Sequence, residues 1–100
     1  MTSRSVTTLH IEHPVTDFDT WHAAFDRFAE NREQAGVRAE RVARPRDDDH
    51  YVVVDLDFDG GEQAQRFLSF LQSTVWASRD ASPALVGRPQ TRILETALAG

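Results

Sequence analysis

The sequence predicts one α+β domain spanning residues 1–100, built as strand, helix, strand, strand, helix, strand, the split βαβ arrangement. Three observations predict it. Four stretches alternate between apolar and polar residues, two others repeat apolar residues at spacings of three and four, and 100 residues leave room for one small domain. Right-handed crossovers would place both helices on one face of a four-stranded antiparallel sheet.

The first strand is predicted between Val6 and His13. Leu9 and Ile11 share one face and alternate with polar residues, as in a half-buried strand. Pro14 lacks the backbone donor that would continue the ladder, so the strand is expected to end there.

A single helix with an aromatic stripe is predicted next. Thr16 and Asp19 have the spacing of a capping box, and an acidic first turn suits the positive end of the helix dipole. Gly36 is a typical C-terminal stop. The stripe, at spacings of three and four, consists of Phe18, Trp21, Phe25 and Phe28.

Two strands are predicted in the middle of the chain, at residues 37–44 and 51–58. The second has a continuous apolar face, with Asp55 and Asp57 on the other side. Neither face of the first is cleanly apolar, and we place Val42 on the same side as Asp55.

The last third of the chain predicts a helix and a final strand. Apolar residues at helical spacing indicate one helix that ends near Ala77. Pro83 prevents a simple continuation, and the final strand is expected at residues 91–97.

One face of the sheet is left without helices, and its predicted members are mixed. They are Thr8, His10, Glu12, Arg38, Glu40, Val42, Tyr51, Val53, Asp55 and Asp57, joined by either Arg92 and Leu94 or Ile93 and Glu95. This face could meet water, RNA or a second copy of the chain. Packing against a second copy fits best, because the apolar members would seal the seam and the polar ones would line a lumen.

Composition narrows the function. The formal net charge of −5 repels nucleic-acid phosphates and anionic membranes, and no stretch approaches the roughly 20 apolar residues that span a bilayer. The absence of cysteine excludes disulfides, thiolate nucleophiles and cysteine-ligated metals. We therefore expect a cytoplasmic protein that binds neither nucleic acid nor membrane.

The strongest candidate for chemistry is a histidine between two carboxylates. His10, Glu12 and Asp55 are predicted on neighbouring strands and one face, where a carboxylate could orient the imidazole for proton transfer. The alternative is hydrogen bonding across a dimer seam or to water. A metal site is not expected, because His13 points to the opposite face and only two ligands would converge.

Two stretches resemble the dimeric α/β-barrel superfamily, in particular its small cyclase-like and antibiotic-biosynthesis-monooxygenase-like members. They are Phe18-x-x-Trp21-x-x-x-Phe25-Asp26 followed by Arg32 and Gly36, and Val86-Gly87-x-Pro89-x-x-Arg92-x-Leu94-Glu95. The resemblance implies a ferredoxin-like protomer and a homodimer whose two sheets face each other. It also implies activities such as cofactor-free oxidation of polyketide quinones, cyclisation or isomerisation.

The resulting prediction is a homodimer that binds or converts a small aromatic or polyketide-like molecule without a cofactor. Its predicted ligand-binding residues are Val42, Val53, Trp76 and Arg92. Trp76 would either wall a cleft between helix and sheet or pack beneath the loop at residues 85–86. The alternative is a non-enzymatic dimeric module with a ligand-sensing or structural role. The sequence decides neither the substrate nor whether the protein is an enzyme.

Overall fold

The computed structural model describes residues 6–98, so residues 1–5 and 99–100 of the predicted domain lie outside the described part. The elements follow the predicted order, with both helical segments divided in two. They are β1 (Thr7–Pro14), α1 (Phe18–Asp26), α2 (Ala29–Ala35), β2 (Ala39–Ala43), β3 (Tyr51–Phe58), α3 (Gly61–Phe70), the π-helical turn η1 (Leu71–Val75) and β4 (Gln90–Glu95). No helix in residues 6–98 is long and apolar enough to cross a bilayer.

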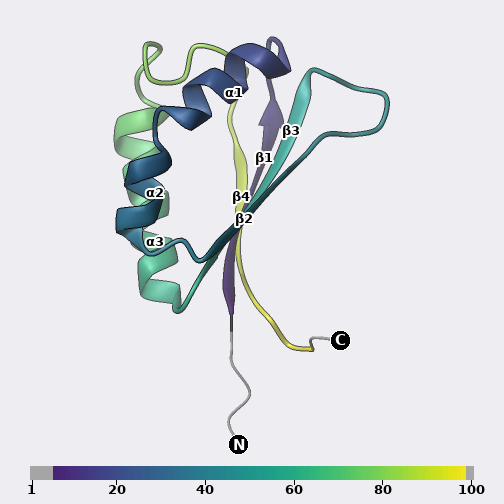
Figure 1. Ribbon diagram of the computed structural model, residues 1–100. Coiled ribbons are helices and arrows are strands. Elements are labelled where there is room, and N and C mark those ends of the chain that lie inside the picture. Colours follow the sequence, from purple (N-terminus) through teal and green to yellow (C-terminus); the bar gives the residue numbers. More distant parts are fainter. Residues whose placement is uncertain (1–5, 99–100) are drawn as a thin grey trace, which may run out of the picture.

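The four strands form one antiparallel sheet in the order β2-β3-β1-β4, and the helices cover one of its faces (Figure 1). The predicted sheet with helices on a single face is confirmed. In the centre of the sheet, His10 of β1 pairs with Asp55 of β3 and with Arg92 of β4. Because directly paired residues share a face, these three side chains lie on the side away from the helices.

The hydrophobic core lies between the sheet and the helices. Residues of β1 and β3 alternate between buried and half-buried, and Leu9, Val52 and Phe58 are almost wholly inaccessible. Trp21 of α1 and Phe67 of α3 close the core from the helix side. Burial of each large apolar side chain contributes about 1.5–3 kcal/mol, so this face holds the helices in place.

The prediction of one continuous first helix was wrong. The backbone amides of Arg27 and Phe28 bond to carbonyls three residues earlier, which tightens the chain into a turn between α1 and α2. The predicted cap was also wrong: Asp17, not Thr16, caps α1, and its carboxylate accepts from the Thr20 amide at 2.8 Å.

The predicted orientation of the second strand was wrong. In the observed register Glu40 pairs with Leu56 and Val42 with Val54, so both face the helix side, and Arg41 faces away from the helices. A shift of one residue moves every side chain of a strand to the other face. The apolar–polar pattern of this strand does not indicate which of its two faces turns toward the helices, because all five residues of β2 are exposed in this chain.

The last strand spans Gln90–Glu95 rather than residues 91–97. Ile93 pairs with buried Leu9, so Arg92 and Leu94 are the pair on the helix-free face. We call this side of the sheet the open face. Its members are Thr8, His10, Glu12, Ala39, Arg41, Ala43, Tyr51, Val53, Asp55, Asp57, Gln90, Arg92 and Leu94.

Candidate functional site

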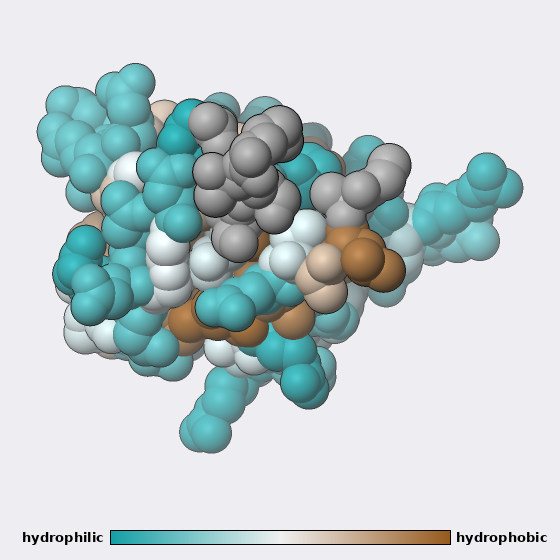
Figure 2. Space-filling view, turned by 90° about the horizontal axis from the view of Figure 1, so that it is seen from below, coloured by the Kyte–Doolittle hydropathy of each residue, from teal (hydrophilic) through white to brown (hydrophobic). Residues whose placement is uncertain are grey.

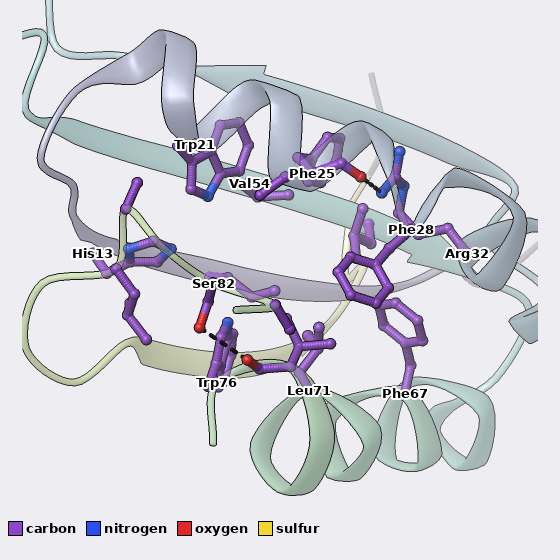
Figure 3. A pocket seen from close by; sticks show the side chains of 17 residues that line it. His13, Trp21, Phe25, Phe28, Arg32, Val54, Phe67, Leu71, Trp76 and Ser82 are labelled. Carbon is purple, nitrogen blue, oxygen red and sulfur yellow. Dashed lines mark hydrogen bonds between the residues drawn. The ribbon is translucent and has the colours of Figure 1, made fainter. Parts of the chain in front are cut away.

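A cavity of about 70 Å³ lies between the helices and the covered face of the sheet (Figure 3). A single water needs about 10–15 Å³ by this measure, so the space has room for several waters or for one small molecule. The side chains that line it come from β1, α1, the turn between α1 and α2, α2, β3, α3, η1 and the loop before β4. They are Ile11, His13, Trp21, Ala24, Phe25, Phe28, Arg32, Val54, Leu56, Phe67, Leu71, Val75, Trp76, Ala81, Ser82, Ala84 and Leu85.

The walls of the cavity are mainly aromatic. Trp21 and Phe25, one turn apart on α1, stack with ring centroids 4.7 Å apart and planes inclined by 23°. Phe28 and Phe67 close the end nearest α2 and α3 (Figure 3). Flat π faces of this kind favour a planar apolar guest, because stacked and edge-to-face contacts add to the energy of area burial.

The wall opposite α1 is shaped by the π-helical turn. The Trp76 amide donates to the Leu71 carbonyl at 2.7 Å, a bond that spans five residues instead of four. The wider turn brings Trp76 toward the side of Leu71, and both line the cavity. Trp76 thus walls a space between helix and sheet, one of the two positions that the sequence left open.

The loop between η1 and β4 closes one end of the cavity. Ser82 donates from Oγ to the Val75 carbonyl at 2.9 Å, which attaches the loop to η1. The Thr16 amide donates to the Ala84 carbonyl at 2.9 Å, and Val15 forms an isolated bridge with Leu85. These bonds hold the loop against the end of β1.

His13 lies at this end of the cavity, beside the polar side chain of Ser82 (Figure 3). It is only 3% exposed, and its Nδ1 lies 2.9 Å from the carbonyl oxygen of Pro14. Burial lowers the pKa of the imidazole, an effect that the bond to the Pro14 carbonyl opposes only in part. His13 is therefore neutral near pH 7.

Arg32 lies at the other end and joins three elements. Its Nε donates to Glu40 at 2.9 Å, its Nη1 donates to the Phe25 carbonyl at the end of α1, and its guanidinium lies 3.6 Å from the centroid of the Phe25 ring. The side chain is 5% exposed. The positive charge of Arg32 at the C-terminus of α1 also interacts favourably with the negative end of the helix dipole. Arg32 holds the bend between α1 and α2 closed.

Sequence reasoning missed most of this site. It treated the aromatic stripe of the first helix as core and gave no role to His13. The available signal was a histidine at an inward position of β1, since Leu9, Ile11 and His13 alternate with outward residues. That signal indicates a buried imidazole, whereas the space beside it depends on side-chain volumes from several elements.

The open face carries the predicted histidine–carboxylate group, and the structure places its members in contact. Nδ1 of His10 lies 2.7 Å from Asp55 and Nε2 lies 2.7 Å from Glu12. Tyr51 donates from its hydroxyl to Glu12 at 2.6 Å. We call these four residues the His10 cluster. Their catalytic role stays a prediction.

The charges of the His10 cluster favour an imidazolium. The bonds to Glu12 and to Asp55 raise the pKa of His10, while partial burial opposes the shift. The bond from Tyr51 and that from His10 lower the pKa of Glu12. Because both ring nitrogens are engaged, His10 has no free lone pair while these bonds persist.

Thr8, Arg41 and Asp57 form a second polar group on the open face. Thr8 donates to Asp57 at 2.7 Å, and Arg41 lies 3.3 Å from the same carboxylate. Burial raises the pKa of Asp57, but the bonds from Thr8 and Arg41 outweigh it and the net pKa is lowered. No group of three or more metal-binding side chains within residues 6–98 is arranged to hold an ion.

The four predicted ligand-binding residues are divided between two places. Val53 and Arg92 lie on the open face with His10, and Trp76 lines the cavity on the other side of the sheet. Val42 does not face the lumen proposed from the sequence, because its register turns it to the helix side.

Large hydrophobic side chains exposed in residues 6–98 are few (Val42, Val86, Leu94 and Leu98), and hydrophilic surface prevails in the view from below (Figure 2).

Comparison with known proteins supports the fold. No protein-family model matches the sequence, and no curated protein sequence matches it. Among solved structures, a protein of unknown function from Nitrosomonas europaea has a TM-score of 0.75 at 13% identity, covering 99% of this chain and 96% of that chain. SnoaB, a cofactor-independent oxygenase from Streptomyces nogalater, has a TM-score of 0.71 at 17% identity, covering 97% of both chains.

A dimeric ferredoxin-like protein from an uncultured marine organism is similar as well, with a TM-score of 0.67 at 9% identity, covering 98% of this chain and 100% of that chain. The fold of this chain is therefore ferredoxin-like, as predicted. The resemblance to antibiotic-biosynthesis-monooxygenase-like and dimeric ferredoxin-like proteins is confirmed at the level of the fold, which is what likenesses at 17% identity or less show.

Proposed function

We propose that this protein binds a small planar aromatic molecule in the cavity between its helices and its sheet. The observation that carries the proposal is the cavity itself, about 70 Å³ with aromatic walls and a histidine at one end. Ligand sites are typically apolar with a few convergent polar groups, and this cavity has that composition. The loop before β4 and the π-helical turn provide its walls.

Conversion of the bound molecule without a cofactor is the finer part of the proposal. It is supported by the fold that this chain shares with SnoaB, an oxygenase that is independent of a cofactor. An aromatic cavity inside such a fold suits oxidation, cyclisation or isomerisation of an electron-rich ring. The alternative is a protein that only senses or carries the same molecule.

Both tryptophans of the chain line the cavity, so their indole signals report on ligand entry. We would titrate ¹⁵N-labelled protein with phenol and follow the two indole N–H resonances. Saturable shifts with a dissociation constant on the order of 1 mM, about −4 kcal/mol, are expected for so small a probe.

Two alanines of α1 provide a matched pair of variants for this titration. Ala24 lines the cavity and is 7% exposed, whereas its neighbour Ala23 is exposed. Ala24→Leu should fill the space and abolish the phenol shifts, and Ala23→Leu should leave them unchanged. Equal binding to both variants, or no binding to the unmodified protein, would overturn the proposed site.

We further propose that the open face packs against a second copy of the chain. The face carries Leu94 and Val53 beside side chains of both charge signs, a combination that can pair with itself across a two-fold axis. Dimerisation of a protein with the same fold supports the proposal. In such a dimer the His10 cluster would lie between the two sheets.

Light scattering after size exclusion would test the dimer. Leu94→Glu should produce a monomer, because it places a charge in the proposed seam. The control is Val86→Glu, since Val86 and Leu94 are both 42% exposed and Val86 lies in the loop before β4. A monomeric unmodified protein, or a dimer that tolerates Leu94→Glu, would contradict the interface.

For a molecule bound between the two sheets of that dimer, rather than in the cavity on the other side of the sheet, His10 is the proposed proton-transfer group, with Glu12 and Asp55 as its orienting partners. Arg92, which pairs with His10 on β4, is the proposed contact for an anionic oxygen, and Val53 is the proposed apolar contact. Native mass spectrometry of the purified dimer would detect a retained molecule. On a substrate found in this way, full activity of His10→Ala would rule out the role, and a dimer without ligand or activity would favour the non-enzymatic alternative.

A further inference from the structure

We propose that His13 determines the specificity of the cavity: its Nε2 accepts a hydrogen bond from a hydroxyl group of the ligand, so the cavity selects phenol-type molecules over apolar or anionic ones of the same shape. This inference rests on the proposed binding function and names the ligand class. Four properties of His13 and its surroundings carry it.

The first property is the tautomer of the imidazole. Nδ1 lies 2.9 Å from the Pro14 carbonyl oxygen, and a carbonyl oxygen can only accept a hydrogen bond. Nδ1 therefore carries the proton. In the neutral ring, Nε2 then holds an unshared electron pair and acts as an acceptor.

The second property is that Nε2 is open to the cavity. Every side-chain nitrogen or oxygen in residues 6–98 that is wholly shut off from solvent has a hydrogen-bond partner. Nε2 has none among these residues, since the one hydrogen bond of the His13 side chain uses Nδ1. The small remaining exposure of this side chain, 3%, thus includes Nε2, and the side chain lines the cavity.

The third property is the absence of a carboxylate that would keep the ring charged. Within the described part of the chain, Arg32 is the only other charged or titratable side chain that lines the cavity, and its Nε is held by Glu40. A ligand thus meets an acceptor at the His13 end, where the Ser82 hydroxyl already donates to the Val75 and Ser78 carbonyls, and mainly apolar walls between the two ends.

The fourth property is the energetic consequence for different ligands. A hydroxyl group donates to Nε2, whereas an apolar ring displaces water and leaves that acceptor unpaired. A net difference of about 1.4 kcal/mol, within the usual range for a hydrogen bond, is a tenfold difference in affinity. A carboxylate near neutral pH has no proton to donate, so at the His13 end its lone pairs would face that of Nε2, which disfavours its binding there.

Three probes separate these cases: phenol and toluene, which are nearly equal in size, and the larger, anionic benzoate. In the indole titration near neutral pH we expect phenol to bind about tenfold more tightly than toluene, and benzoate to bind more weakly than phenol. His13→Phe should remove the preference for phenol. His13→Gln, which restores a side-chain acceptor, should keep much of it, and His22→Phe on the exposed side of α1 is the control that should change nothing.

The ring nitrogens of the unmodified protein provide a readout that needs no variant. We expect the ¹⁵N resonance of His13 Nε2 to lie in the range of an unprotonated nitrogen and to move upfield with phenol but not with toluene. Equal affinities for phenol and toluene, or an Nε2 signal that phenol leaves in place, would overturn the role of His13 while the cavity proposal stands. If neither probe binds, both proposals fail.

Discussion

His10 and His13 lie three residues apart on β1 and face opposite sides of the sheet. His10 is held between two carboxylates on the open face, which raise its pKa, whereas burial beneath the helices lowers the pKa of His13. One strand thus presents on one side an imidazole that holds its proton more tightly than usual and on the other side an imidazole that releases it more readily. Each has a different consequence for stability and binding.

We expect His10 to stabilise the fold most at mildly acidic pH. Its folded-state pKa lies above the ordinary value of 6.5, so the folded protein holds this proton more tightly than the unfolded chain. The contribution is complete below about pH 6.5 and is lost as the pH rises through the folded-state pKa. Relative to His10→Gln, the unmodified protein should gain about 2 kcal/mol at pH 5.5–6 and less at higher pH, as measured by urea unfolding.

His22→Gln is the matched control for this series, because the His22 side chain is 54% exposed and its nearest carboxylate, Asp26, lies 3.5 Å away. A difference between the unmodified protein and His10→Gln that grows as the pH rises would contradict the assignment of an imidazolium to His10.

His13 should show the opposite dependence. Its folded-state pKa lies below 6.5, so the unfolded chain takes up the proton first as the pH falls. The unmodified protein should therefore lose stability relative to His13→Gln as the pH falls from about 6.5 through the folded-state pKa. Urea midpoints of the two proteins between pH 7.5 and pH 5 measure this, and a constant difference would show that His13 is not held neutral.

Replacement of Arg32 should destabilise the protein far more than replacement of an exposed arginine. Arg32→Lys keeps the charge but loses the planar group that reaches Glu40 and the Phe25 carbonyl together. We expect a loss of about 2 kcal/mol in the free energy of unfolding. Arg38→Lys is the control, since the Arg38–Asp59 pair is exposed on both sides and should change stability by less than about 1 kcal/mol. Similar losses in both variants would refute the bridging role.

Gly36 should not tolerate a side chain. It ends α2 with a φ of 97°, and an added Cβ would lie 2.9 Å from Nε2 of Gln63. Gly36→Ala should lower the free energy of unfolding by about 1–2 kcal/mol, or roughly 4–16 °C in Tm for a domain of this size. Gly61→Ala, at a position with open space and no positive φ, should be neutral or slightly stabilising. A neutral Gly36→Ala would show that the chain adopts another conformation here.

Local patterns determined a large part of this fold. The alternation around Leu9 and Val52 predicts which face of β1 and β3 is buried, because a misplaced apolar row would be exposed to water. That alternation also places His10, Glu12 and Asp55 on one face. Their contact then requires only that β1 and β3 pair in the observed register.

The tertiary structure decided the rest, for reasons that no local pattern contains. The strand that contains Val42 has no cleanly apolar face, so the side of the sheet on which Val42 lies depends on the register of β2 against β3. The break after Asp26 depends on Arg32, which bonds back to the Phe25 carbonyl and across to Glu40. The cavity beside His13 exists because side chains from segments far apart in the sequence leave space unfilled. Sequence periodicity carries the direction of each side chain, but packing volumes and contacts between distant residues are properties of the assembled chain.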